Sequence, residues 1–259
     1  MTQSITLNPE ARTQYLLRIA DTCLILGQRL GEWCGHAPVL EEDIALANMA
    51  LDLVGQARAL LTHAGIDAGI EGGFDEDQLA FLRDERDYLN ITLVELPRGD
   101  FAFTVLRNVV VATWLKLLWD RLALSTDTEL AAIAGKAVKE ARYHQQHAAD
   151  WLVRLGDGTA QSRHRCEAAL AALWRYTAEL FDADAVDAAA ADSGLGPAWA
   201  DLADPWRAEM AQILADATLV MPETSAFRST GKRGVHSEHM GPLLAEMQHL
   251  QRAYPGGVW

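Results

Sequence analysis

The sequence predicts an all-α fold, a bundle of long helices with almost no β-structure. Apolar side chains recur every three or four residues along most of the chain, which is the period of an amphipathic helix. At least four of the expected helices exceed the usual length of about 11 to 12 residues, and their connections are short, which favours antiparallel neighbours. No internal repeat and no Ser/Pro-rich linker divides the chain, so residues 1–259 are expected to form one domain.

The first two expected helices form a pair. Asn8 is an N-cap followed by Pro9 at the first helical position, and the helix runs until Gly35 and Pro38 stop it. The acidic residues 41–43 favour the positive end of a second helix, which ends near the Gly-rich loop at 65–73.

Three more long helices are expected before residue 156. The third runs from an Asp75 cap to about Leu96, and the fourth follows a Pro-containing break and spans residues 101–124. Thr126 and Glu129 form a capping box that opens the fifth, which continues to about Leu155. Shorter helices are expected at 162–181, at 205–219 after an Asp204 cap, and at about 237–254, with an irregular segment at 222–234.

Charge excludes two classes of partner. The chain has 36 acidic and 22 basic side chains, a formal net charge of −14. Such a molecule repels nucleic acid and anionic membrane surfaces over most of its area. No secretory signal is evident, and the most apolar segment, 101–124, is interrupted by charged side chains, so we expect a cytoplasmic protein.

Cysteines and tryptophans are expected to serve the core. Cys23, Cys34 and Cys166 are scattered and show no Cys-x-x-Cys spacing, so we interpret them as reduced core thiols. The eight tryptophans are better explained as core and interface anchors than as a binding cage.

The second helix carries an incomplete metal motif. Helical bundles that hold two irons use Glu-x-x-His on two of their helices, because residues three apart lie on one face. Here the corresponding positions are Asp52 and Gly55, and glycine offers no ligand atom.

The remaining expected metal-ligand positions are also incomplete. On the fifth helix, His144 is present but Ala141 stands three residues before it. Glu32 could be a single carboxylate from the first helix, whereas the fourth helix offers Asn108, which cannot neutralise metal charge. Two acids and one histidine cannot balance two irons, so the sequence predicts no metal centre and no catalytic residue in this chain.

Three other clusters could carry chemistry. Glu140, His144 and His147 lie on one side of the fifth helix, where a metal-binding surface is geometrically feasible. His236 and His239 are three residues apart near a helix start, where a cap with polar surface contacts is favoured over a metal site. The basic segment 228–233 is interpreted either as a solvated turn or as a contact for a phosphate or an acidic neighbour.

Long segments of the chain closely resemble the C subunits of phenylacetyl-CoA 1,2-epoxidase complexes. The resemblance covers essentially the whole sequence and is carried by Leu26–Pro38, Leu46–Arg58, Lys139–His144, Leu173–Asp184 and Thr230–Gln248. It implies a ferritin-like helical bundle with additional C-terminal helices, and a role in aerobic phenylacetate degradation. In such complexes a catalytic A subunit holds the di-iron centre, and a reductase subunit with FAD and an iron–sulfur cluster delivers electrons.

The resemblance also implies what this chain does within a monooxygenase complex. It is expected to be a structural subunit without a cofactor of its own, pairing with the A subunit and forming a homodimer when isolated. By motif, the counterparts of the six ligands in A are Glu32, Asp52, Gly55, Asn108, Ala141 and His144. We expect Glu32, Asp52 and His144 to be hydrogen-bonded if buried, the alternative being that they face solvent.

Two other functions stay open at this point. The chain could itself be a metal-dependent oxygenase that uses Glu140, His144 and His147. It could also be an acyl-CoA-binding module, in which Arg228, Lys232 and Arg233 contact the CoA phosphates or, failing that, a partner subunit. The structural role predicts a broad apolar face, since obligate interfaces commonly bury more than about 2,000 Å².

Overall fold

A computed structural model describes residues 4–7, 10–66, 68–69 and 72–257. Within these residues the regular structure is helical and no strand longer than an isolated bridge occurs, so the predicted all-α class is confirmed. The α-helices are α1 (Ala11–Gly31), α2 (Leu40–Gly65), α3 (Glu76–Phe81), α4 (Thr92–Glu95), α5 (Phe101–Leu122), α6 (Thr128–Gly156), α7 (Ala160–Trp174), α8 (Ala185–Asp192), α9 (Ala203–Asp216) and α10 (Met240–Ala253). Short 3₁₀ helices are η1 (Glu85–Asp87), η2 (Thr177–Phe181), η3 (Trp199–Leu202) and η4 (Gly231–Arg233).

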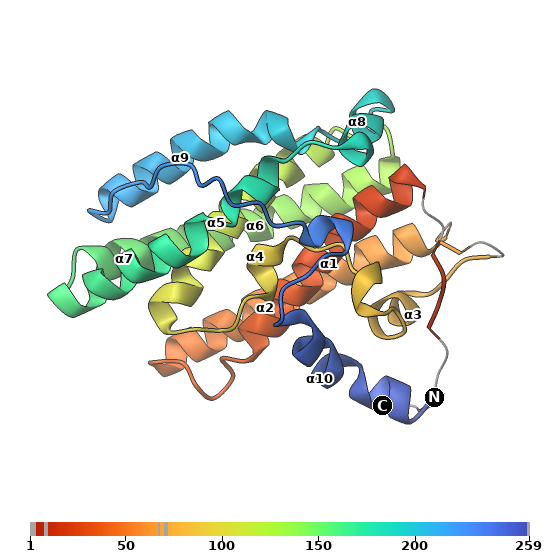
Figure 1. Cartoon of the computed structure of the whole chain (residues 1–259), viewed down its shortest axis with the longest axis horizontal. Coiled ribbons are helices and arrows are strands. Elements are labelled where there is room, and N and C mark those ends of the chain that lie inside the picture. Colours follow the sequence, from red (N-terminus) through yellow and green to blue (C-terminus); the bar gives the residue numbers. More distant parts are fainter. Residues whose placement is uncertain (1–3, 8–9, 67, 70–71, 258–259) are drawn as a thin grey trace.

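Four long helices form the centre of the molecule as two antiparallel pairs (Figure 1). The α1–α2 pair and the α5–α6 pair are each joined by a short turn and packed closely along their length, whereas α2 and α6 touch far less. One long crossover, residues 66–100, connects the pairs, which is the topology of ferritin-like bundles. Helices α7 and α9 pack on α5 and α6, and α10 lies beside α3.

Helix α5 is the central element of this bundle. Most of its residues are buried on every side, as expected for a helix surrounded by α6, α7 and α9. Trp114 and Trp119 lie fully inside, and the indole of Trp33 reaches from the end of α1 to donate to Thr104 at 2.9 Å. Large side chains thus fill the space between the two helix pairs. By length and composition alone, α2 and α5 could cross a membrane, but core helices pass the same test.

The predicted third helix, 75–96, is wrong. Asp75 does cap a helix, but α3 ends at Phe81, and only η1 and α4 follow. Arg83 turns into the core to form a buried ion pair with Asp21. The backbone N–H groups of Leu89 and Ile91 then donate to side chains of α1, Asp21 Oδ2 at 2.8 Å and Thr22 Oγ1 at 3.3 Å. Tertiary hydrogen bonds therefore replace the helical ones.

Several boundaries also differ from the prediction. Helix α6 is capped by Asp127, which accepts from Leu130 N, and not by Thr126. Helix α9 starts one residue before Asp204, so Asp204 is not its cap. The segment 162–181 is divided into α7 and η2, and the short helix α8 was not predicted. The predicted cap at Asn8 and Pro9 lies outside the described residues.

An irregular strap, residues 217–239, connects α9 to α10. Figure 1 shows it running back across the long helices before α10 begins. In its middle part Ser229, Gly231 and Lys232 are buried, whereas Arg233 is exposed. The predicted irregular segment, 222–234, lies within the strap and outside the α-helices, although it contains η4, and the structure adds that part of it is packed into the fold.

Candidate functional site

The two helices that would each need Glu-x-x-His in a di-iron bundle meet along a polar line of contact, here called the α2–α6 seam. Three pairs form it. Glu42 lies 3.1 Å from His147, Asp52 Oδ2 lies 3.0 Å from His144 Nε2, and Gln56 Nε2 donates to Glu140 Oε2 at 2.9 Å. Each of these three polar side chains of α6 therefore faces one polar side chain of α2.

His144 lies at the centre of the seam. It is buried, while the side chain of its partner Asp52 is 39% exposed. Burial lowers the pKa of His144, and the hydrogen bond to Asp52 opposes this only in part. A neutral imidazole that donates from Nε2 to Asp52 fits these contacts. The prediction that His144 and Asp52 have polar partners is confirmed.

Two positions of the seam have no ligand atom to offer. Ala141 is buried beneath it and Gly55 lies on its exposed side, where an added Cβ would have nothing within 4 Å. The neighbouring acid, Glu140, is directed to Gln56 and not to His144. The seam therefore holds half of each Glu-x-x-His motif.

Glu32 and Asn108 lie away from the seam. Glu32 follows the last residue of α1, where it pairs with Arg29, and lies five residues beyond Gly27, which packs against Leu53 and Val54 next to Asp52. At 1.5 Å per residue, Glu32 is therefore about 7.5 Å along α1 from the level of Asp52. On α5, Gln145 contacts Thr113, five residues or about 7.5 Å beyond Asn108. Of the six predicted counterparts, Asp52 and His144 are joined by a hydrogen bond, and Glu32 pairs with Arg29 instead.

Other residues occupy the level of the seam on α1. Cys23 Sγ lies 3.6 Å from Gln56 Oε1, and Gly27 packs against Val54 and Leu53. Burial raises the pKa of the Cys23 thiol, as expected of an inert core cysteine. Sequence reasoning missed Cys23 and Gln56. Counting residues outward from the turn at 32–39 pairs position 23 with position 48, so nothing in the sequence indicated that Cys23 lies opposite Gln56.

The donor set does not fit a di-iron centre. No group of three or more His, Cys, Asp or Glu side chains could hold a metal ion in the described ranges of the chain. The predicted alternative site is divided as well, because Glu140, His144 and His147 each face a different residue of α2. At the α1 level of the seam, Cys23 and Gly27 offer no carboxylate.

The predicted phosphate-binding set is not assembled either. Lys232 is 1% exposed and its amino group contacts Asp187 at 3.3 Å and the Asp182 carbonyl, so it cannot reach a ligand in solvent. Arg233 pairs with Asp182 and Asp184. Arg228 is exposed and donates to the carbonyls of Ser225 and Phe227. The interpretation of this segment as a solvated turn is wrong for Lys232.

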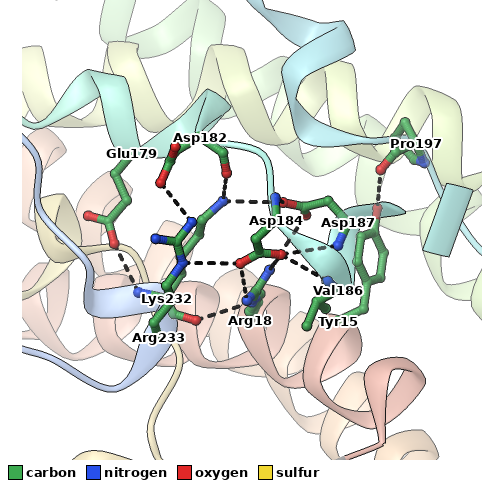
Figure 2. Close-up of polar contacts among 10 residues, drawn as sticks. All are labelled: Tyr15, Arg18, Glu179, Asp182, Asp184, Val186, Asp187, Pro197, Lys232 and Arg233. Atoms are coloured by element: carbon green, nitrogen blue, oxygen red, sulfur yellow. Dashed lines mark hydrogen bonds and ion pairs between the residues drawn. The ribbon is translucent and has the colours of Figure 1, made fainter. Parts of the chain in front are cut away.

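Buried charges attach the strap to the helices in what we call the strap cluster (Figure 2). Arg18 of α1 donates to both oxygens of Asp184, at 2.9 and 2.7 Å, and to the Lys232 carbonyl at 3.1 Å. Burial acts to raise the pKa of Asp184, but the hydrogen bonds from Arg18 outweigh it and hold that pKa well below its usual range. The cluster consists of Arg18, Glu179, Asp182, Asp184, Asp187, Lys232 and Arg233.

A second anchor of the strap is His236, predicted as a surface contact but in fact buried. Its Nδ1 lies 2.8 Å from Glu95 Oε2 and its Nε2 lies 2.9 Å from the Tyr88 carbonyl. A carbonyl and a carboxylate both accept, so both ring nitrogens donate and the ring is an imidazolium. Burial opposes the charge, yet the contacts with Glu95 prevail and raise the pKa of His236. His239, by contrast, is partly exposed.

The cysteine prediction holds for two of three residues. Cys23 and Cys166 are buried free thiols, and burial raises the pKa of Cys166 to about 11. Cys34 is exposed in the turn between α1 and α2, so its assignment to the core is wrong. Seven tryptophans lie inside or against the core, as predicted, and Trp259 is outside the described residues.

Comparison with known proteins identifies the family. A family model described as "Phenylacetic acid catabolic protein" matches residues 1–259. The chain belongs to this family. It is 51% identical, over 247 residues, to a protein of Escherichia coli (strain K12) that is named as the C subunit of 1,2-phenylacetyl-CoA epoxidase. The alignment covers 95% of this chain and 98% of that relative.

The titratable groups of the seam, among them the imidazoles of His144 and His147, can bind and release protons. Its carboxylates and imidazoles already face one another in pairs, and the cleft beside Gly55 opens to solvent.

Proposed function

We propose that this chain is a structural, non-catalytic subunit of a phenylacetyl-CoA 1,2-epoxidase, pairing with the catalytic A subunit in aerobic phenylacetate degradation. The name of its relative in E. coli supports the subunit role. The observation that carries the non-catalytic part is the α2–α6 seam. Gly55 and Ala141 supply no ligand atom where a di-iron bundle needs a histidine and a glutamate, and Asp52 and His144 bond to each other.

The proposal assigns the cofactors to other subunits. The di-iron centre belongs to A, and FAD and the iron–sulfur cluster belong to the reductase. Other subunits of the complex are further partners, and the isolated chain is expected to associate with itself. We place the complex in the cytoplasm, in keeping with the net charge of −14, which disfavours anionic membranes.

Co-purification with the catalytic subunit tests the proposal. The subunit ratio, the iron content and the oxidation of phenylacetyl-CoA are measured on the same preparation. We expect a stable complex whose iron resides in the partner. About two irons on this chain after iron-loaded expression would overturn the proposal in favour of an oxygenase of its own.

A substitution separates a structural role from a catalytic one. His144→Gln in this chain, combined with the unaltered partner, should leave turnover within about twofold once assembly is verified, because the imidazole contacts only protein groups. Loss of turnover by more than about a hundredfold in a fully assembled complex would contradict a non-catalytic role. Calorimetry with phenylacetyl-CoA on the isolated chain addresses the acyl-CoA-binding alternative, and heat of binding at millimolar ligand would support that alternative instead.

A further inference from the structure

The first half of α2 exposes three large apolar side chains among polar ones, where a surface helix is expected to be polar. Leu40 is 73% exposed, Ile44 54% and Leu51 69%. Together with Val39 before α2 and Tyr143 on α6, they account for five of the eleven large exposed hydrophobic side chains in the described part of the chain. Contiguous apolar patches of this kind mark interaction sites, whereas single exposed apolar residues need no explanation.

The spacing of these residues makes one stripe. Residues 40, 44, 51 and 55 recur at helical intervals on the outer side of α2, while Leu46, Met49 and Leu53 fill the inner side. A helix that is apolar all round is normally buried all round. The most apolar window of α5 is 78% buried in this bundle, but that of α2 is only 44% buried. Helix α2 thus contains a segment as apolar as a core helix, but no other element in the described part of this chain covers its outer side.

A groove runs beside the stripe. It has a volume of about 340 Å³, and its walls on α2 and α6 include four small residues among larger apolar and charged ones. At Gly55 an added Cβ would meet nothing within 4 Å. Ala59, Ala132 and Ala137 continue this lining, so the groove is open to a large side chain from another molecule.

Charge decides what kind of molecule fits. The groove is lined by three carboxylates, Asp52, Glu129 and Glu140, and by one amine, Lys136. A second copy of the chain, or an anionic membrane, would bring negative charge against negative charge here. A different subunit with basic side chains would instead find both apolar contact and opposite charge.

We propose that this α2–α6 face, formed by Leu40, Ile44, Leu51, Tyr143 and the groove, is where the catalytic subunit docks through a helix that carries apolar and basic side chains. The inference rests on the proposed function and deepens it, since it assigns the partner to one face of the bundle. Central, apolar residues of an interface usually carry most of its free energy, which makes Ile44 and Leu51 the residues to change.

Binding of the catalytic subunit is measured by titration calorimetry for the unaltered chain and two double variants. Ile44→Arg with Leu51→Arg buries charge in the interface, and its affinity should fall at least about a hundredfold. The matched control is Leu124→Arg with Val220→Arg, two residues that are 82% and 83% exposed outside this face. The control should bind within about threefold of the unaltered chain.

A third variant removes the groove without adding charge. Gly55→Leu fills the space beside the stripe and should weaken binding about tenfold, while circular dichroism shows the same helical content and unfolding temperature within a few degrees. Asp52→Asn with Glu129→Gln should reduce the salt dependence of the association rate, because two of the charges that attract the partner are lost.

The outcomes separate the two proposals. If the unaltered chain does not bind the catalytic subunit, the proposed function fails. If it binds and Ile44→Arg with Leu51→Arg binds equally well, the function stands and the docking face is wrong. The face is also wrong if that variant abolishes only self-association in light scattering, or only adsorption to anionic vesicles, with binding of the catalytic subunit unchanged.

Discussion

The strap cluster and the α2–α6 seam both consist of polar pairs between distant segments. They differ in how deeply the charges are buried and in how many partners each charge has. In the strap cluster Arg18, Asp187 and Lys232 are almost fully buried, and Glu179 accepts from Thr92 N, Ser229 Oγ and Lys232 N. In the seam each group of α6 faces one side chain of α2, and Asp52 is 39% exposed. Buried charges that share several partners cannot be changed singly without a large cost, whereas a seam pair such as His144 and the partly exposed Asp52 should cost less to change.

This difference suggests which region serves the fold and which serves assembly. The strap cluster holds the C-terminal part of the chain against α1 and α8. The seam adds less to the fold, and it borders the exposed apolar stripe and the groove. Substitutions in the two regions should therefore differ in size and in their dependence on pH.

The largest effect is expected at Lys232. Lys232→Met removes one of the two cations that face the buried Asp187 and leaves only Arg18, at 3.6 Å, which should lower the free energy of unfolding by about 3 kcal/mol. Urea denaturation followed by circular dichroism measures the change. The control Lys139→Met alters an exposed lysine and should stay within about 0.5 kcal/mol. Adding Asp187→Leu to Lys232→Met should recover much of the loss, and further destabilisation would show that the pair is not the reason.

His236 should give a smaller effect that weakens as the pH rises. The groups facing it are Glu95 and, at longer range, Asp21, and they raise its pKa above the unfolded value of about 6.5. Its stabilisation is fully present below about pH 6.5 and is lost as the pH rises through the folded pKa. His236→Gln should therefore cost about 1–3 kcal/mol at about pH 6 and less at about pH 9. An equal cost at both pH values would rule out a charged His236.

His144 should show the opposite dependence on pH. Burial lowers its pKa below about 6.5, with Asp52 and Glu140 favouring the charged form and His147 opposing it. Its contribution is present above about pH 6.5 and is lost as the pH falls through the folded pKa. His144→Gln should cost about 1 kcal/mol at about pH 8 and less at about pH 5 in urea denaturation. A cost that grows as the pH is lowered would show that His144 is charged in the folded state.

Glycine substitutions should give the smallest effects, with different signs in packed and open parts of α1 and α2. Gly55→Ala adds a methyl group in open space within a helix and should raise stability by about 0.5–1 kcal/mol. Gly27→Ala would place its Cβ 3.2 Å from Val54 and 3.3 Å from the Ala50 carbonyl, so it should gain nothing or lose stability. Thermal unfolding measures both changes. An equal gain in stability at both sites would mean that the space around Gly55 is no larger than the space around Gly27.

The four long helices could be predicted from sequence because their cores are periodic and local. Helix α1 buries Tyr15, Ile19, Cys23, Leu26 and Leu30, the residues whose spacing predicted it. The break after Phe81 could not be predicted, since it depends on Asp21 and Thr22, which are more than sixty residues away in sequence.

The candidate site was predictable in part for the same reason. The absence of donors at Gly55 and Ala141 is visible in the sequence, and so is His144. The registration between helices is not visible in the sequence. For this reason Glu32 was grouped with Asp52, although the structure places Glu32 near the turn between α1 and α2. Burial of Lys232 depends on acids some fifty residues earlier, so a local charge pattern could not indicate it.

The strap cluster also affects the order in which the molecule can be completed. Arg18 is in the first long helix, yet it donates one of its hydrogen bonds to the carbonyl of Lys232, 214 residues later. During synthesis, the contacts of Arg18 and Asp187 with Lys232 can form only after the strap has left the ribosome. Contacts of such long sequence separation form late and slow folding, and they expose intermediates to aggregation. Cells that produce this subunit should therefore benefit from chaperones, or from a partner that binds the nascent bundle early.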